Sequence, residues 1–180
     1  MVRKTASVLF LFSTIIISSC LNQNNSFVGE ISDPKEYPAI MNEVGNENSL
    51  SHFPPDIPKG SDFVRFHYQP NILQGGNVLQ LRVRLSQEKV QFIRAKHIID
   101  ALQVIPQGEK QQYKKASSDF CFPNFYTSDT NHRDWPESYE ILILGSESLG
   151  SEDFPWNHGV CFGVSISTNK SEIIYWYEDW

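Results

Sequence analysis

Histidine and carboxylate side chains gather in two polar stretches of the C-terminal half of the chain. Asp129, His132 and Asp134 lie in the first stretch, and His158 lies in the second. Such groups can bind a metal ion or act as a general base. Their spacing matches no metal-ligand motif, and Asp, Asn and Ser are common in loops. No cofactor or metal is therefore predicted, and His132, Asp134 and His158 stay as candidates only.

Three arginines occupy two neighbouring stretches with alternating hydrophobicity. Arg65, Arg82 and Arg84 would share one face of a sheet if these stretches pair as a hairpin. A guanidinium group matches both carboxylate and phosphate groups, so this face could bind an anion. The alternative is that the arginines form ion pairs with glutamates of neighbouring strands, namely Glu140, Glu172 or Glu178.

Tryptophans form a third group, concentrated towards the C-terminus. Trp135, Trp156 and Trp180 could stack on sugar rings or contact a partner protein if they are exposed. The alternative is a set of core aromatics, which suits Trp176 in a terminal strand.

Cys121 and Cys161 are the two cysteines outside the N-terminal region. In an exported protein such a pair predicts a disulfide, and closing a loop of about forty residues would stabilise the fold by roughly 4 kcal/mol. Two buried free thiols are the alternative. Neither cysteine has the surroundings of a catalytic nucleophile.

Several catalytic motifs are absent from the sequence. The chain has no Gly-x-Ser-x-Gly elbow, no glycine-rich phosphate loop, no His-Glu-x-x-His and no Cys-x-x-Cys. The sequence therefore has none of the motifs that usually indicate a hydrolase, a nucleotide-binding enzyme or a zinc protein. The sequence therefore favours a non-catalytic role.

The candidate residues must be positioned by a strand and a helix in the middle of the chain. Residues 78–85 alternate between apolar and polar side chains, which predicts a strand with one core face and one solvent face. Ser86 is a suitable N-cap for a helix that runs to Ile105, before Pro106. Its apolar residues cover more than half of its circumference, so we expect a largely buried helix.

The other elements complete an α+β fold in the order β-β-α-β-β-β. The expected strands are residues 63–69, 78–85, 139–144, 159–167 and 172–178. They predict one mainly antiparallel sheet of about five strands, with one long helix packed on one face. Residues 106–136 are long and polar, and they either hold a short element or carry function.

The first twenty residues have the pattern of an export signal. Arg3 and Lys4 precede a short apolar run that ends in Ile17-Ser18-Ser19-Cys20. This tetrapeptide resembles the lipobox of bacterial lipoproteins. The resemblance implies that residues 1–19 are a cleaved signal peptide and that Cys20 carries the lipid, palmitate included. An ordinary signal peptide is the alternative.

The residues after Cys20 divide into a tether and one domain. Residues 20–51 are rich in Asn and poor in apolar residues, which predicts a flexible tether with a span of roughly 30 Å. Residues 52–180 predict a single globular domain, expected to be monomeric.

Charge limits the partners of the mature chain. The sequence has 15 Lys and Arg against 21 Asp and Glu, and removing residues 1–19 leaves 13 against 21, a net charge of −8. This balance argues against nucleic acid and against electrostatic docking on anionic membranes. We expect attachment to the cell membrane or outer membrane through lipid, on the extracytoplasmic side.

A second resemblance covers part of the domain. Segments 53–58, 66–70, 73–76 and 79–82 are similar to small bacterial lipoproteins of unassigned function, so no functional residue carries over. The sequence thus predicts a lipid-anchored protein with a non-catalytic binding or envelope-assembly role, with an envelope protein or a glycan as possible partner. The alternatives are an envelope hydrolase or metal-dependent enzyme using the loop His and Asp residues, and a glycan-binding module using the aromatics.

Overall fold

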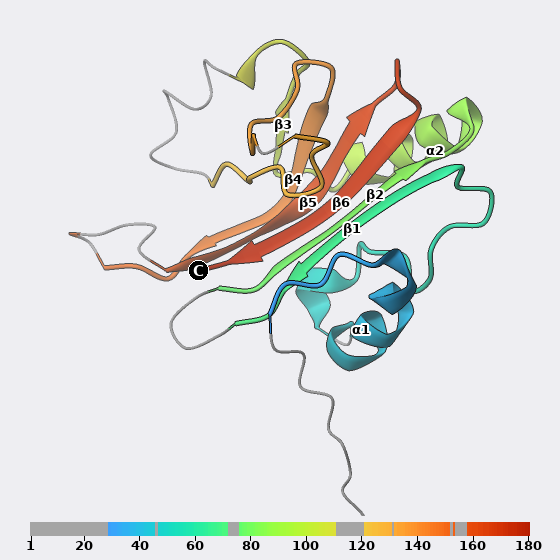
Figure 1. Ribbon diagram of the computed structural model, residues 1–180. Coiled ribbons are helices and arrows are strands. Elements are labelled where there is room, and N and C mark those ends of the chain that lie inside the picture. The colour runs from blue at the N-terminus through green and yellow to red at the C-terminus, as the bar shows by residue number, and fades with distance from the viewer. Residues whose placement is uncertain are drawn as a thin grey trace, which may run out of the picture.

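A single antiparallel sheet forms the centre of the protein in the computed structural model (Figure 1). The structure describes residues 29–45, 47–71, 76–110, 121–130, 132–151, 153 and 158–180. Within them, six strands lie in the order β1-β2-β6-β5-β4-β3. In chain order they are β1 Phe63–Gln69, β2 Val78–Arg84, β3 Gln103–Ile105, β4 Glu140–Ser148, β5 Gly159–Ser167 and β6 Glu172–Asp179. The predicted antiparallel sheet is confirmed, with six strands where about five were expected.

The helix α2 (Gln87–Ile98) follows β2 but is shorter than predicted. Ser86 caps it as expected, because its hydroxyl accepts a hydrogen bond from the Lys89 N–H at 3.4 Å. The predicted extension to Ile105 is wrong, because the last three residues of that stretch form β3 and pair with β4 at the sheet edge. The β-branched side chains there suit an extended strand.

The predicted burial of this helix is also wrong. Within α2 only Val90 and His97 are buried. Phe92 is 71% exposed, and Ile99, directly after the helix, is 82% exposed. The apolar residues of this stretch therefore face two ways, and one group of them lies at the surface.

Residues 31–45 and 47–50, predicted as part of a flexible tether, pack onto the sheet instead. They form the short 3-10 helices η1 (Pro34–Glu36) and η2 (Asn48–Leu50) and the helix α1 (Tyr37–Val44). Tyr37 and Ile40, three residues apart on one face of α1, are fully buried. The folded part of the chain therefore begins before residue 52, and residues 20–28 and 46 of the predicted tether lie outside the described residues.

The two faces of the sheet are covered by different parts of the chain. α1 lies against one face, and residues 121–139 lie across the opposite face (Figure 1). We call residues 121–139, in which residue 131 is not described, the covering segment. Gln80 and Arg82 of β2 are 0% and 4% exposed beneath it, so the predicted solvent face of this strand is buried.

Candidate functional site

Strand register places three arginines together on the sheet face beneath the covering segment. Arg65 of β1 lies opposite Arg82 of β2, and Arg84 lies opposite Glu172 of β6. The ring of Phe63 lies 5.8, 4.9 and 5.0 Å from the guanidinium carbons of Arg65, Arg82 and Arg84. The arginine cluster, as we call it, consists of Phe63, Arg65, Arg82, Arg84, Asp129 and Glu172.

Arg82 is the buried centre of this cluster. Its Nη2 lies 3.0 Å from Glu172, and its Nη1 lies 3.0 Å from Asp129 and donates to the Thr127 carbonyl at 3.0 Å. Its Nε donates to Glu172 at 3.1 Å. All three guanidinium nitrogens are therefore engaged within the protein, and Arg82 holds the covering segment on the sheet.

Glu172 is the buried counter-charge, with a side chain that is 1% exposed. Burial alone would raise the pKa of this carboxyl group. Hydrogen bonds from Tyr139 and Arg84, with the charge of Arg82, instead hold the pKa below its ordinary value. Glu172 is therefore ionised at neutral pH, and two arginines share its charge.

Arg65 and Arg84 occupy the open rim of the cluster, with side chains 54% and 42% exposed. Arg65 Nη2 contacts Asp129 at 3.2 Å, and Arg84 Nη2 contacts Glu172 at 2.9 Å. Among the described residues, the other guanidinium nitrogens of these two arginines have no hydrogen-bond partner. Three cations face two carboxylates, so the arginine cluster has an excess of one positive charge.

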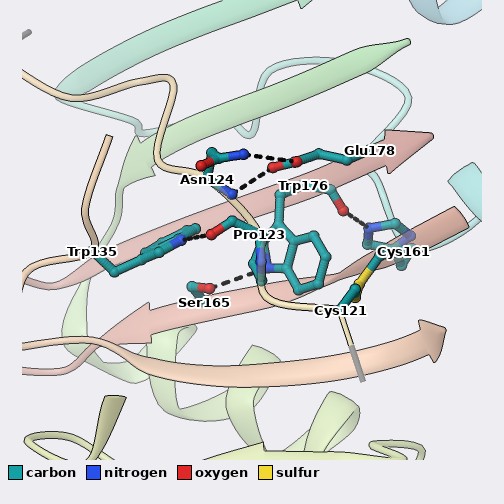
Figure 2. Close-up of a disulfide and its surroundings, with 9 residues drawn as sticks. Cys121, Pro123, Asn124, Trp135, Cys161, Ser165, Trp176 and Glu178 are labelled. Atoms are coloured by element: carbon teal, nitrogen blue, oxygen red, sulfur yellow. Dashed lines mark hydrogen bonds between the residues drawn. A yellow bond between two sulfur atoms is a disulfide. The ribbon is translucent and has the colours of Figure 1, made fainter. Parts of the chain in front are cut away.

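The covering segment is attached to the sheet at several points (Figure 2). Cys121 and Cys161 of β5 form a disulfide with Cα atoms 6.2 Å apart, as predicted. The backbone N–H groups of residues 126 and 127 donate to the Gln80 side-chain oxygen at 2.9 and 3.2 Å. Trp135 donates from its indole N–H to the Pro123 carbonyl at 2.8 Å, which folds the segment on itself. These contacts fix the segment over the sheet without regular secondary structure.

Glu178 of β6 binds the same segment near the disulfide (Figure 2). Its carboxylate accepts the Asn124 backbone N–H at 2.7 Å and the Asn124 side-chain amide at 3.3 Å. Burial raises the pKa of Glu178 to about 7, although Asn124 and the charge of Arg133 oppose the shift. This attachment therefore contains a group that changes its charge near neutral pH.

His67 joins three segments beside this contact. Its ring stacks on the Tyr126 ring, with 4.8 Å between the two ring centroids. The guanidinium carbon of Arg133 lies 4.6 Å from the centroid of the same Tyr126 ring. His67 Nδ1 lies 3.3 Å from Glu30. Burial lowers the pKa of His67, while Glu30 opposes that shift. No local pattern indicates a role for this histidine, because its partners come from distant positions in the chain.

The candidate metal or acid–base residues come from two separate parts of the chain. His132 and Asp134 lie in the covering segment, whereas His158 directly precedes β5, and all three are exposed. Within the described part of the chain, no three His, Cys, Asp or Glu side chains come close enough to hold a metal ion. Asp129 is in the arginine cluster instead, where it binds Arg65 and Arg82.

Two of the three tryptophans in the described residues are core residues. Trp176 is 0% exposed and donates to the Ser165 hydroxyl at 3.1 Å, and Trp135 is 5% exposed. Trp180 is partly buried, and Trp156 lies outside the described residues. Trp176 therefore fits the core alternative, and the buried Trp135 is not available to stack on a sugar ring.

The expected lipidation site, Cys20, also lies outside the described residues. In the part of the chain that the structure describes, no helix has the length and apolarity needed to cross a membrane. No protein-family model, no curated protein and no solved structure matches this chain.

Proposed function

We propose that this chain is a lipid-anchored extracytoplasmic protein with a non-catalytic binding role, and that the rim of the arginine cluster binds an anionic group of its ligand. The anchor rests on the lipobox-like Ile17-Ser18-Ser19-Cys20. A disulfide between Cys121 and Cys161 is typical of an oxidising compartment outside the cytoplasm, which supports the same location.

The binding site is inferred from the exposure and the unused hydrogen-bond donors of Arg65 and Arg84. Both guanidinium groups are partly exposed, and each uses only one nitrogen in an ion pair within the described residues. Their remaining N–H groups flank the Phe63 ring and can donate two or more hydrogen bonds to a carboxylate or phosphate.

Local charge favours an anion at this rim even though the whole chain is acidic. Asp129 and Glu172 neutralise two of the three arginines, so one positive charge remains. Arg82 is buried and fixed, which holds the backbone of β2 and the neighbouring arginine in place. An incoming anion therefore meets a preorganised pair of donors and needs little rearrangement of the protein.

The test is isothermal titration calorimetry of the full chain at low salt, with inorganic phosphate and with citrate as the ligands. It measures the affinity for each anion. We expect the double variant Arg65→Gln and Arg84→Gln to weaken binding at least about tenfold. Lys35→Gln removes an exposed cation elsewhere and serves as the control. Equal binding by the double variant and the wild type would refute the site, as would an equal loss in the control.

A further inference from the structure

The side chain of Asp129 already binds the arginine cluster in the way that an external anion would. Its Oδ1 lies 3.2 Å from Nη2 of Arg65, and its Oδ2 lies 3.0 Å from Nη1 of Arg82. One carboxylate therefore bridges a rim arginine and the buried arginine with its two oxygens. Within the described residues, the Asp129 side chain makes no other hydrogen bond or ion pair. The cluster thus contains an anion-binding position that the protein itself fills.

The two carboxylates of the cluster differ in how easily they can leave it. Glu172 has a side chain that is 1% exposed, and it lies 3.0 Å from Arg82 and 2.9 Å from Arg84. Moving it would leave buried charge without a partner, which is costly. The Asp129 side chain is 53% exposed and can turn into solvent. Arg82 would then keep Glu172 and the Thr127 carbonyl as partners, so Asp129 is the carboxylate that an outside group can replace.

We infer that a phosphate group of the ligand binds the arginine cluster by replacing the Asp129 carboxylate. The inference rests on the anion site proposed at Arg65 and Arg84, and it names the anionic group and the contact that this group displaces. Once Asp129 has left, three arginines face Glu172 alone, so the excess is two positive charges. A phosphomonoester carries about −1.5 to −2 charges at pH 7 and has three strong acceptor oxygens. It matches that excess, whereas a single carboxylate supplies one charge and two oxygens.

Asp129 lowers the affinity for the ligand because its carboxylate must leave first. Two ion pairs with an exposed member together favour the paired state by about threefold to tenfold. The apparent affinity for an outside anion falls by the same factor, since the anion binds the fraction of molecules in which the arginines are free. Removing the charge of Asp129 should therefore tighten phosphate binding by about threefold to tenfold.

The first test is isothermal titration calorimetry of the full chain in detergent at low salt, with inorganic phosphate as the ligand. Asp129→Asn keeps the size of the side chain and removes its charge, so it should bind phosphate about threefold to tenfold more tightly than the wild type. Asp62→Asn is the matched control, because Asp62 is exposed next to Phe63 and forms no ion pair within the described residues. Its affinity should differ from the wild type by less than about twofold. Acetate should bind the wild type at least about tenfold more weakly than phosphate.

Nuclear magnetic resonance of the wild type separates displacement of Asp129 from an effect of the substitution on folding. Phosphate should shift the resonance of the side-chain carboxyl carbon of Asp129 and leave that of Asp62 unchanged. Glycerol phosphate in solution and phosphatidic acid in the detergent micelles carry the same phosphomonoester group. A shift of the Asp129 resonance with either compound supports the inference and shows which source the site accepts.

Three results would each overturn the inference. They are phosphate binding by Asp129→Asn that is no tighter than that of the wild type, acetate binding as tight as phosphate binding, and an Asp129 resonance that neither ester moves. The double variant Arg65→Gln and Arg84→Gln shows how far the failure extends. If it binds phosphate as well as the wild type does, the proposed function fails too. If it loses binding while Asp129→Asn shows no gain, only the present inference fails.

Discussion

Glu178 gives the most quantitative prediction, because one buried carboxyl group should control part of the pH dependence of stability. The native protein holds its proton up to about pH 7, since burial raises the pKa, whereas the unfolded chain releases it near 4.5. Between these values the native state binds more protons than the unfolded state. Its stability therefore falls as the pH rises through this range.

The expected size of the effect follows from the two pKa values. Between pH 5 and pH 8, the contribution of Glu178 to the free energy of unfolding should fall by about 2.5 kcal/mol. Glu178→Gln removes the titrating group but keeps a side-chain oxygen that can accept the Asn124 N–H. The variant should match the wild type within about 1 kcal/mol at pH 5 and be more stable at pH 8.

The assay is urea unfolding at pH 5 and pH 8, with the disulfide intact, for the wild type and Glu178→Gln. Histidines act in the opposite direction: burial lowers the pKa of His52 to about 4, so its contribution is complete above pH 6.5 and is lost as the pH falls. Because both proteins contain these histidines, the difference between them isolates Glu178. Glu147→Gln, an exposed glutamate on β4, is the control. Identical pH dependence in wild type and Glu178→Gln would refute the reasoning.

Three further predictions concern the disulfide, the buried ion pairs and the anchor. Replacing Cys121 and Cys161, which are 40 residues apart, with serine should lower the free energy of unfolding by about 4 kcal/mol in urea titrations, and a change below about 1 kcal/mol would contradict the chain-entropy account. Arg82→Met should lower the free energy of unfolding by about 3–5 kcal/mol because it leaves Glu172 buried with fewer partners. Arg65→Met, at an exposed position, should lower it by under about 1 kcal/mol. Equal losses for the two variants in thermal or urea unfolding would argue against Arg82 as the buried centre of the cluster. Cys20→Ser should accumulate as an unprocessed, unlipidated precursor, as globomycin treatment of the wild type should also produce, and normal processing by mass spectrometry would rule out lipidation at this residue.

The strands show how much of the fold could be predicted from local pattern. β1 and β5 have the predicted bounds, because apolar and polar side chains alternate along them. The secondary structure of the stretch after α2 could not be predicted from local pattern. Ile99 to Ile105 is apolar enough to suit a helix or a strand, and pairing of its last three residues with β4 makes them a strand.

The candidate site depended more strongly on distant contacts. Strand alternation predicted that Arg65, Arg82 and Arg84 share one face of the sheet. Glu172 was one of three predicted ion-pair partners, and it binds Arg82 and Arg84 in the structure. Asp129 lies 64 residues from Arg65 in sequence, so its part in the cluster could not be inferred from spacing. Likewise Gln80 and Arg82 were expected to face solvent, because nothing local to β2 indicates that a distant polar segment covers them.

The pairing of Ile31 with Tyr68 near the end of β1 limits how far the sheet can lie from a lipid anchor on Cys20. The backbone groups of these residues bond in both directions at 2.8 Å, so ten residues separate Cys20 from Ile31, the first described residue whose backbone pairs with the sheet. Ten residues span at most about 36 Å even when fully extended. The attachment lies at one end of β1, and Phe63 of the arginine cluster lies at the other, about 17 Å further along the strand. In a lipid-anchored protein, the rim arginines would therefore work within a shell of a few tens of ångströms above the bilayer, which bounds how far away a surface-bound ligand can be held.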